Sequence, residues 1–357
     1  MIHVRNAWHV ACWAMDLGIG VPQAMTIAND PIVLFRTPGG RLAALEDRCV
    51  HRLAPLSLGR CEGESLRCMY HGLRFDAGGA CVEIPGQDRI PAAARVRAYP
   101  VVERHSWIWV WPGDPAKADP ALIPQAVGFD DPDYILGRGQ LDYAANAQLI
   151  HDNLCDFTHL AFVHPASFGA DEEWARTRPK VTPLPRAVRF ERWVRGQKGA
   201  RSGGEAVDVW SSYEYHVPGI LLMPTASYPA GTADRLGDAP PPPDLPATGV
   251  TFTSQAVTAL TDDTSRYFFS WGPHRAHGDA ALRDFLMGLA GKAFAEDKAM
   301  IEAQQRVIDR DPSRRPMPVG FDKGVVLFQR LVERLAREEM QGAPRAASTP
   351  QGLEPVR

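Results

Sequence analysis

The sequence has no long apolar run and no marked excess of charge of either sign. No stretch approaches the length of about 18 apolar residues that a membrane-spanning helix requires. The opening segment MIHVRNAWHVACWAMDLG lacks the basic start, apolar stretch and cleavage site of a secretory signal. The net charge is −3, and no cluster of Lys and Arg marks a surface for nucleic acid or membrane. We therefore expect a cytoplasmic protein whose partners include a small molecule and neither nucleic acid nor a membrane.

Cysteine is also scarce, with six residues in a chain of 357. The six are widely spread: Cys12, Cys49, Cys61, Cys68, Cys81 and Cys155. Such scarcity and spacing are not typical of a disulfide framework. In a reducing compartment, thiols that lie near histidines indicate a metal site first.

The chain length predicts more than one hydrophobic core, because single cores rarely serve so many residues. Residues 24–111 consist of short β-branched and aromatic runs separated by turn signals, which predicts an antiparallel β domain. The segment WPGDPAKADPALIP then changes the composition abruptly. We predict domains at residues 1–115 and 116–340, followed by a disordered tail at 341–357.

The second domain mixes strand and helix signals. Strand-like runs at 210–215, 250–259 and 267–271 precede helical periodicity over 280–310. This mixture predicts an α+β domain with a central antiparallel sheet flanked by helices. The proline-rich run at 230–249 cannot continue a strand or a helix, so we predict a surface loop.

The strongest motif pairs a Cys-x-His with a Cys-x-x-His sixteen residues later. The pairs are Cys49 with His51 and Cys68 with His71, and each follows a predicted strand. Two cysteines and two histidines suit either tetrahedral zinc or a [2Fe-2S] cluster with two thiolates on one iron and two imidazoles on the other. Zinc fingers usually group like ligands together, so the mixed pairs favour the Rieske type of cluster. Its imidazole ligands raise the reduction potential, which predicts an electron carrier.

A second candidate metal site lies in the segment NLCDFTHLAFVHP. His159 and His164 are five residues apart, about 140° around an ideal helix, so they would not share a helical face. Pro165 disfavours helical geometry at His164, and the helix should therefore end there and let the two imidazoles converge. Asn153, Asp156 and His159 follow one another at intervals of three, which predicts that Asp156 forms hydrogen bonds close to the His159 ligand.

Two histidines and one carboxylate on one face of iron leave positions open for dioxygen and substrate. The helix FAEDKAMIEAQQ offers a third ligand, because Phe294, Asp297 and Ile301 fall on one stripe. Asp297 should be buried there, whereas Glu296 and Lys298 should point elsewhere. An unpaired buried carboxylate is costly, and a metal ion would offset this cost.

With these residues, the chain resembles the Rieske non-haem iron oxygenases, in the branch of the vanillate and dicamba O-demethylase oxygenase subunits. The likeness spans residues 3 to 310 and includes VRNAWHVA, CVHRLAPLSLG, CMYHGLRFD, HDNLCDFTHLAFVH and AEDKAMIEAQQ. It implies that Cys49, His51, Cys68 and His71 hold a [2Fe-2S] cluster and that His159, His164 and Asp297 hold a mononuclear Fe(II). It also implies a homotrimer in which Asp156 joins His159 to His71 of a neighbouring subunit, with Asn153 near the iron.

The resemblance further implies a terminal oxygenase that hydroxylates or O-demethylates an aromatic substrate, by analogy an aromatic carboxylate. A separate NAD(P)H-dependent flavin and iron-sulfur reductase, or a ferredoxin, would supply electrons. Val50 and Cys155 depart from the family pattern without removing a ligand, and the strands around Leu222, Met223 and Gln255 should line the pocket. The alternatives are a ring cis-dihydroxylating dioxygenase, a Rieske electron-transfer protein without oxygenase activity, and a zinc-binding scaffold.

Overall fold

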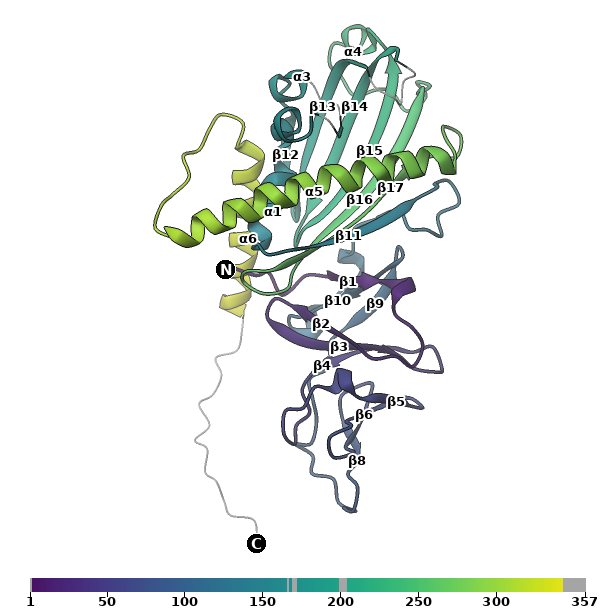
Figure 1. The fold of residues 1–357 in the computed structure, drawn as a ribbon, viewed down its shortest axis with the longest axis vertical. Helices are drawn as coiled ribbons and strands as arrows, with labels where there is room; N and C mark the ends of the chain where they lie inside the picture. The colour runs from purple at the N-terminus through teal and green to yellow at the C-terminus, as the bar shows by residue number, and fades with distance from the viewer. Residues whose placement is uncertain (1, 166, 169–171, 199–203, 343–357) are drawn as a thin grey trace.

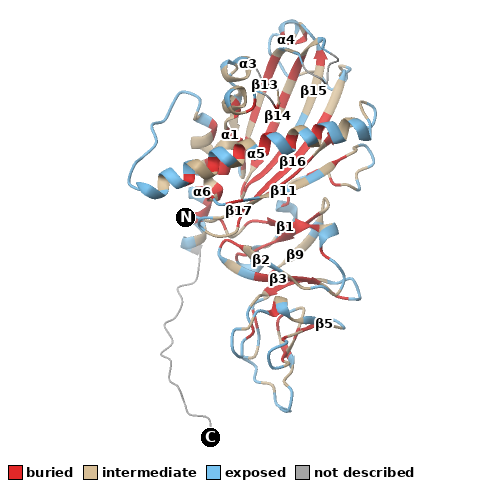
Figure 2. Cartoon of the chain, in the orientation of Figure 1, coloured by how far each residue is buried: buried red, intermediate tan, exposed pale blue. Residues whose placement is uncertain are grey.

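The computed structural model describes residues 2–165, 167–168, 172–198 and 204–342. The molecule is elongated, with small β-sheets at one end and a large sheet covered by helices at the other (Figure 1). The strands of the large sheet are mostly buried, whereas the loops at the far tip of the small-sheet end are exposed (Figure 2). This division confirms the predicted α+β architecture.

The N-terminal part contains three small antiparallel sheets. The first has the order β1-β10-β9, the second β2-β3-β4 and the third β5-β6-β7-β8. Their bounds are β1 His9–Trp13, β2 Gln23–Ile27, β3 Asp30–Arg36, β4 Leu42–Glu46, β5 Arg60–Glu62, β6 Ser65–Arg67, β7 Arg74–Asp76, β8 Cys81–Glu83, β9 Val101–Arg104 and β10 Trp107–Val110. The predicted antiparallel β domain is therefore present, and it also includes a strand at the N-terminus.

The C-terminal part is built on a seven-stranded antiparallel sheet with the order β11-β17-β16-β15-β14-β13-β12. Its strands are β11 Gly137–Tyr143, β12 Lys180–Pro183, β13 Ala187–Lys198, β14 Ala206–His216, β15 Ile220–Pro229, β16 Gly249–Ala259 and β17 Ser265–Pro273. The α-helices are α1 Ala147–Cys155, α2 Leu160–Val163, α3 Glu172–Arg176, α4 Thr232–Arg235, α5 Ala280–Arg310 and α6 Lys323–Gly342. In Figure 1, α5 crosses the sheet, and this helix matches the periodicity predicted for 280–310.

Local capping fixes where the long helices begin. The Asp279 side chain accepts a hydrogen bond from the backbone N–H of Leu282, which satisfies one of the free donors at the start of α5. The Asn146 side chain caps α1 in the same way, by accepting a hydrogen bond from the backbone N–H of Leu149. Helix α6 was not predicted, although its apolar residues recur at helical spacing and Phe328, Leu331 and Leu335 enter the main core.

The two parts of the chain share a hydrophobic core. Trp8 and Val10 of the N-terminal part pack with Ile220, Leu222 and Phe268 of the large sheet. The Oγ1 atom of Thr258 also donates a hydrogen bond of 2.6 Å to the Val10 carbonyl. Residues before the proposed boundary near 116 therefore stabilise the large sheet, and removing them would expose its apolar face.

The proline-rich segment at 230–249 is more ordered than the predicted surface loop. It contains α4, and its Ala233 packs with Trp193 and Tyr228 in a separate small core. Arg195 forms ion pairs with Asp234 and Asp238 across this contact. The segment is thus held in two ways. Its short helix packs Ala233 against the sheet, and its two aspartates pair with Arg195.

No helix within the described ranges is long and apolar enough to cross a membrane. The predicted tail at 341–357 lies outside the described residues, apart from Gln341 and Gly342, which end α6.

Candidate active site

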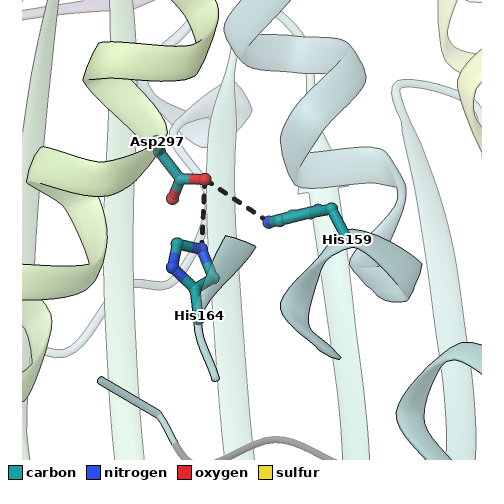
Figure 3. Close-up of side chains that lie close together, drawn as sticks. All are labelled: His159, His164 and Asp297. Carbon is teal, nitrogen blue, oxygen red and sulfur yellow. Dashed lines mark ion pairs between the residues drawn. The ribbon is translucent and has the colours of Figure 1, made fainter. Parts of the chain in front are cut away.

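His159, His164 and Asp297 converge on one point (Figure 3). One potential ligand atom from each residue lies within 4.8 Å of the others. Nε2 of His164 is 3.1 Å from Oδ1 of Asp297, and Nε2 of His159 is 3.5 Å from the same oxygen. The structure therefore brings together the three predicted ligands from segments more than 130 residues apart in the sequence.

Two helix ends create this convergence. Helix α1 ends at Cys155, and Asp156 caps the short 3-10 helix η5 (Phe157–His159) by accepting a hydrogen bond of 2.9 Å from the Thr158 N–H. Helix α2 ends at Val163, and His164 takes a non-helical conformation with ψ of 34°. The prediction that the helix ends at the residue before Pro165 is confirmed, and this turn lets both imidazoles face the same carboxylate.

The donor set fits a bound metal ion. Nε2 of His164 is buried without a hydrogen-bond partner although Oδ1 of Asp297 lies 3.1 Å away, so the two atoms are close but not aligned as donor and acceptor. Burial lowers the pKa of His159, which favours the neutral imidazole that ligates metals. Burial opposes protonation of His164, but the Asp297 and Glu296 carboxylates raise its pKa above the ordinary value. A divalent cation bound at Nε2 would take the place of the second proton of His164.

A second carboxylate supports His164, contrary to the prediction that Glu296 points elsewhere. Oε2 of Glu296 accepts hydrogen bonds from Nδ1 of His164 at 2.8 Å and from Oγ of Ser167 at 2.6 Å. A carboxylate on the far nitrogen fixes the tautomer that leaves Nε2 free to bind a metal. Helical periodicity could not reveal this contact, because the long Glu296 side chain reaches around α5 to a residue on another segment.

Asn153 and Asp156 also lie beside the three ligands. Nδ2 of Asn153 donates to Oδ1 of Asp297 at 3.0 Å and lies 3.3 Å from Nε2 of His159. Asp156 contacts His159 through its backbone carbonyl, which is 2.5 Å from Nδ1. The hydrogen bond predicted between Asp156 and the His159 region is therefore present, but the backbone carbonyl makes it, because α1 ends before Asp156 and the carboxylate caps η5.

We expect Glu296→Ala to reduce iron binding by roughly 10- to 100-fold, because His164 loses the acceptor that orients its ring. Glu296→Gln should restore most of the binding, since the amide oxygen can still accept from Nδ1. The measurement is iron per chain after dialysis against a graded series of chelator concentrations. The exposed Gln304 lies on the same helix, and Gln304→Ala is the matched control. Unchanged iron affinity in Glu296→Ala would contradict this role.

The other four predicted ligands lie on two loops at the small-sheet end. Cys49 and Cys68 are buried, each with 1% of its surface exposed, whereas His51 and His71 are exposed. The two imidazole rings are 4.5 Å apart between their centroids. Each loop folds back after its cysteine. The carbonyl of Cys49 accepts a hydrogen bond from the N–H of Leu53, and the carbonyl of Cys68 accepts one from the N–H of Gly72. The thiols thus form an inner pair and the imidazoles an outer pair.

This arrangement fits a cluster better than a single zinc ion. An inner pair of thiols and an outer pair of imidazoles matches a cluster in which one iron takes two thiolates and the other takes two imidazoles. Burial and the neighbouring Cys68 thiol raise the pKa of Cys49 to about 11. A thiolate in this position therefore requires a strong cationic partner, which the iron of a cluster supplies.

A cavity of about 690 Å³ extends from His159 and Asp297 along the large sheet. Its wall includes Asn153, His159 and Asp297 at one place and residues of β14, β15 and β16 elsewhere. Met223 and Gln255 line it as predicted, whereas the Leu222 side chain joins the core shared with the N-terminal part. The volume is in the range of pockets that bury small organic ligands.

Comparison with protein families gives two matches along the chain. Residues 7–100 match the model of the Rieske [2Fe-2S] domain. Residues 143–338 match the model of the vanillate O-demethylase oxygenase C-terminal domain. Each match includes one of the two candidate metal sites.

Three curated relatives match nearly the whole chain. The iron-sulfur subunit of a toluene-4-sulfonate monooxygenase system from Comamonas testosteroni is 38% identical, with 95% of this chain and 99% of the relative covered. A vanillate O-demethylase oxygenase subunit from a Pseudomonas species is 34% identical, with 96% and 97% covered. The dicamba O-demethylase oxygenase component of Stenotrophomonas maltophilia is 34% identical, with 95% and 99% covered.

The fold also matches solved structures. Dicamba monooxygenase bound to dicamba superposes with a TM-score of 0.84 at 32% identity, covering 96% of this chain and all of that one. Dicamba monooxygenase has also been solved with non-haem iron and dicamba, and it matches with a TM-score of 0.76 at 30% identity. The similarity therefore extends over both the small sheets and the large one.

Proposed function

This chain belongs to the Rieske non-haem iron oxygenases, and we propose that it is the terminal oxygenase of a system that hydroxylates or O-demethylates an aromatic carboxylate. The observation that carries this proposal is the convergence of His159, His164 and Asp297 beside a cavity, in a chain that also has a Rieske domain. An electron carrier and an oxygen-binding site in one chain are the two parts that such a reaction needs. The relatives named for toluene-4-sulfonate, vanillate and dicamba support an aromatic substrate.

We assign the cofactors to the residues whose chemistry fits them. Cys49, His51, Cys68 and His71 would hold the [2Fe-2S] cluster, and His159, His164 and Asp297 would hold Fe(II). When bound, these groups supply stored electrons and dioxygen activation, respectively. Glu296 holds a proton of His164 on Nδ1 and so orients Nε2 toward the metal position, and Asn153 orients Asp297 through its hydrogen bond. The walls of the cavity exclude bulk water from the reacting part of the substrate.

We propose a separate NAD(P)H-dependent reductase or a ferredoxin as the electron donor. The names of the relatives describe a component of a multi-part system, which supports such a partner. The exposed His51 and His71 lie among apolar side chains that are also exposed, including Leu53 at 65% and Tyr70 at 60%. Exposed apolar groups around a redox centre are suited to transient protein docking.

We also propose a homotrimer located in the cytoplasm. Within one chain, the loops that carry His51 and His71 lie at the small-sheet end of the elongated molecule, whereas α5 crosses the large sheet (Figure 1). A head-to-tail ring would place the cluster end of one subunit beside the iron site of the next. Asp156, which precedes η5 and retains partial exposure, would lie between the two centres. The resemblance to the family supports three subunits rather than another number.

The decisive experiment measures metal, acid-labile sulfide and the electron paramagnetic resonance spectrum of the anaerobically purified protein after reduction. We expect about three irons and two sulfides per chain together with a Rieske signal. Aromatic acids are then screened with isotope-labelled dioxygen, and one labelled oxygen atom per product would support monooxygenation. Zinc instead of iron, or iron at the cluster alone, would contradict the proposed function, and incorporation of two oxygens would indicate cis-dihydroxylation.

A further inference from the structure

The cavity beside the metal ligands is much longer than a single aromatic ring. On β16 its lining extends from Gln255 to Gly249, six positions that span roughly 20 Å at about 3.4 Å per residue. On α5 its lining extends from Asp297 to Leu282, fifteen positions that cover about 22 Å of helix. Two separate elements thus give nearly the same length. A benzene ring with one small substituent would fill only part of it.

The two ends of the cavity differ in exposure. Gln255 lies opposite Phe269 of β17, and the Phe269 ring is 4.8 Å from that of Phe294, which precedes Asp297 by one helical turn. This metal end is buried, with 4% of Gln255 and 6% of Asp297 exposed. The residues that line the other end are exposed: Lys198, Glu205, Ala230 and Thr248. We call these four residues the rim, and a ligand that enters there meets the metal ligands with its leading end.

The register of the large sheet makes the floor of the cavity continuous. Met223 of β15 lies opposite Thr253 of β16 toward the metal end, and Ser227 of β15 lies opposite both Val209 of β14 and Gly249 of β16 toward the rim. All five residues line the cavity. Because alternate residues of a strand point to the same face, these side chains belong to one surface. A single long ligand can therefore lie along it.

An apolar stripe of α5 faces this floor. Leu282, Phe285 and Leu289 line the cavity and share one side of the helix by their spacing of three and four residues. The Phe285 side chain is large and apolar, yet 41% of the residue is exposed. Val207 and Val209 add apolar surface from the sheet. An apolar ligand between the stripe and the sheet would remove these side chains from water, which is favourable.

We propose that the substrate is elongated, with its aromatic ring at the metal end and a long apolar substituent that runs between the α5 stripe and the sheet to the rim. The proposal rests on the proposed function, because it specifies the size and shape of the substrate of the same site. The cavity volume of about 690 Å³ agrees with it. Cavities of about 300–1,000 Å³ typically bury most of a ligand that is larger than one ring.

The test measures how affinity depends on ligand length in anaerobic holoenzyme. Titration calorimetry compares four neutral probes that share a methoxyphenyl ring: 4-methoxybenzyl alcohol, 3-(4-methoxyphenyl)propan-1-ol, 5-(4-methoxyphenyl)pentan-1-ol and 7-(4-methoxyphenyl)heptan-1-ol. The methoxy group can face the metal end while the terminal hydroxyl stays hydrated at the rim. We expect the wild-type protein to bind about two- to fourfold more tightly for each added methylene, because each is buried against apolar walls.

Gly249→Leu should shorten the cavity. A Cβ added at Gly249 has the Cβ of Ser227 as its nearest neighbour at 3.8 Å, an ordinary van der Waals contact, so a side chain can extend from it into the cavity. We expect this variant to bind the heptanol probe about 10-fold or more weakly than the wild type and the benzyl alcohol within about threefold. Phe285→Ala should weaken binding of the heptanol probe by about 3- to 10-fold, and it tests the stripe even if Gly249→Leu does not fold.

Gly291→Leu is the matched control, because it makes the same substitution on α5 outside the cavity. Gly291 is exposed, and a Cβ added there meets no atom within 4 Å. It is nine positions from Leu282, which places it on the opposite side of the helix from the apolar stripe. We expect this variant to bind all four probes like the wild type.

The outcomes separate ligand length from a general disturbance of the fold. Wild-type affinity that does not change with chain length, or that is absent for every probe, overturns the proposal. Gly249→Leu that weakens binding of all four probes equally, or leaves the length dependence unchanged, also overturns it.

The proposed function can fail separately, because binding requires no turnover. Affinity that rises with length, together with no oxygenated product from any aromatic substrate under dioxygen and electron supply, would contradict the proposed function alone. Product from short aromatic substrates without any dependence of affinity on length would contradict the elongated substrate alone.

Discussion

Replacing Asp297 with alanine is expected to lower product formation to below about one hundredth of the wild-type rate. Loss of a group that only supports a metal ligand already costs 10- to 100-fold, and Asp297 is in direct contact range of both histidines. Without its charge, two neutral imidazoles remain, and they bind Fe(II) more weakly than the full set of two histidines and one carboxylate. Iron should fall from about three to about two atoms per chain.

The cluster provides an internal reference for this experiment. Because Asp297 lies on α5 and the cluster loops lie at the other end of the molecule, the Rieske signal should be unchanged in Asp297→Ala (Figure 1). Asp284 is an exposed acid on the same helix, and Asp284→Ala should retain all three irons and full activity. Retention of the third iron by a folded Asp297→Ala protein would contradict its assignment as a ligand.

Replacing Asp156 with asparagine is expected to leave both metals bound yet to reduce coupled product formation by about 100-fold. The substitution should not disturb the iron site, because His159 contacts the backbone carbonyl of Asp156 and the amide oxygen can still cap η5 at Thr158. Among the described residues, none donates a hydrogen bond to Oδ2, the second carboxylate oxygen of Asp156. That oxygen is free to accept from a neighbouring subunit, and an amide nitrogen in its place cannot.

The direct measurement is the rate at which the pre-reduced cluster is reoxidised by dioxygen in the presence of bound substrate. We expect slow reoxidation in Asp156→Asn and normal reoxidation in Asp152→Asn, a control with the same chemical change on α1 that keeps its contact with Gln329. Mixed assemblies of Asp156→Asn and Cys68→Ser chains should recover part of the activity, since a site can combine one intact Asp156 with a neighbour's intact cluster. Full activity of Asp156→Asn alone would rule out the bridging role.

The sequence alone was sufficient to predict the two candidate metal sites, because their ligands are rare residue types in short motifs. Cys49, His51, Cys68 and His71 could be paired by spacing, and the turn at His164 followed from the proline after it. Asp297 could be identified because periodicity on a long helix places it on the buried stripe. Each of these predictions depended on residues close together in the chain.

The tertiary structure alone decided which distant side chains support those ligands. Glu296 reaches His164 across more than 130 residues of sequence, and the register of β14, β15 and β16 brings Ser211, Thr225 and Thr251 together along the cavity. A local pattern carries no information on strand register or on how far a long side chain extends from its helix. The candidate ligands could therefore be predicted from the sequence, whereas the shape of the cavity that faces them arises from packing between segments far apart in the chain.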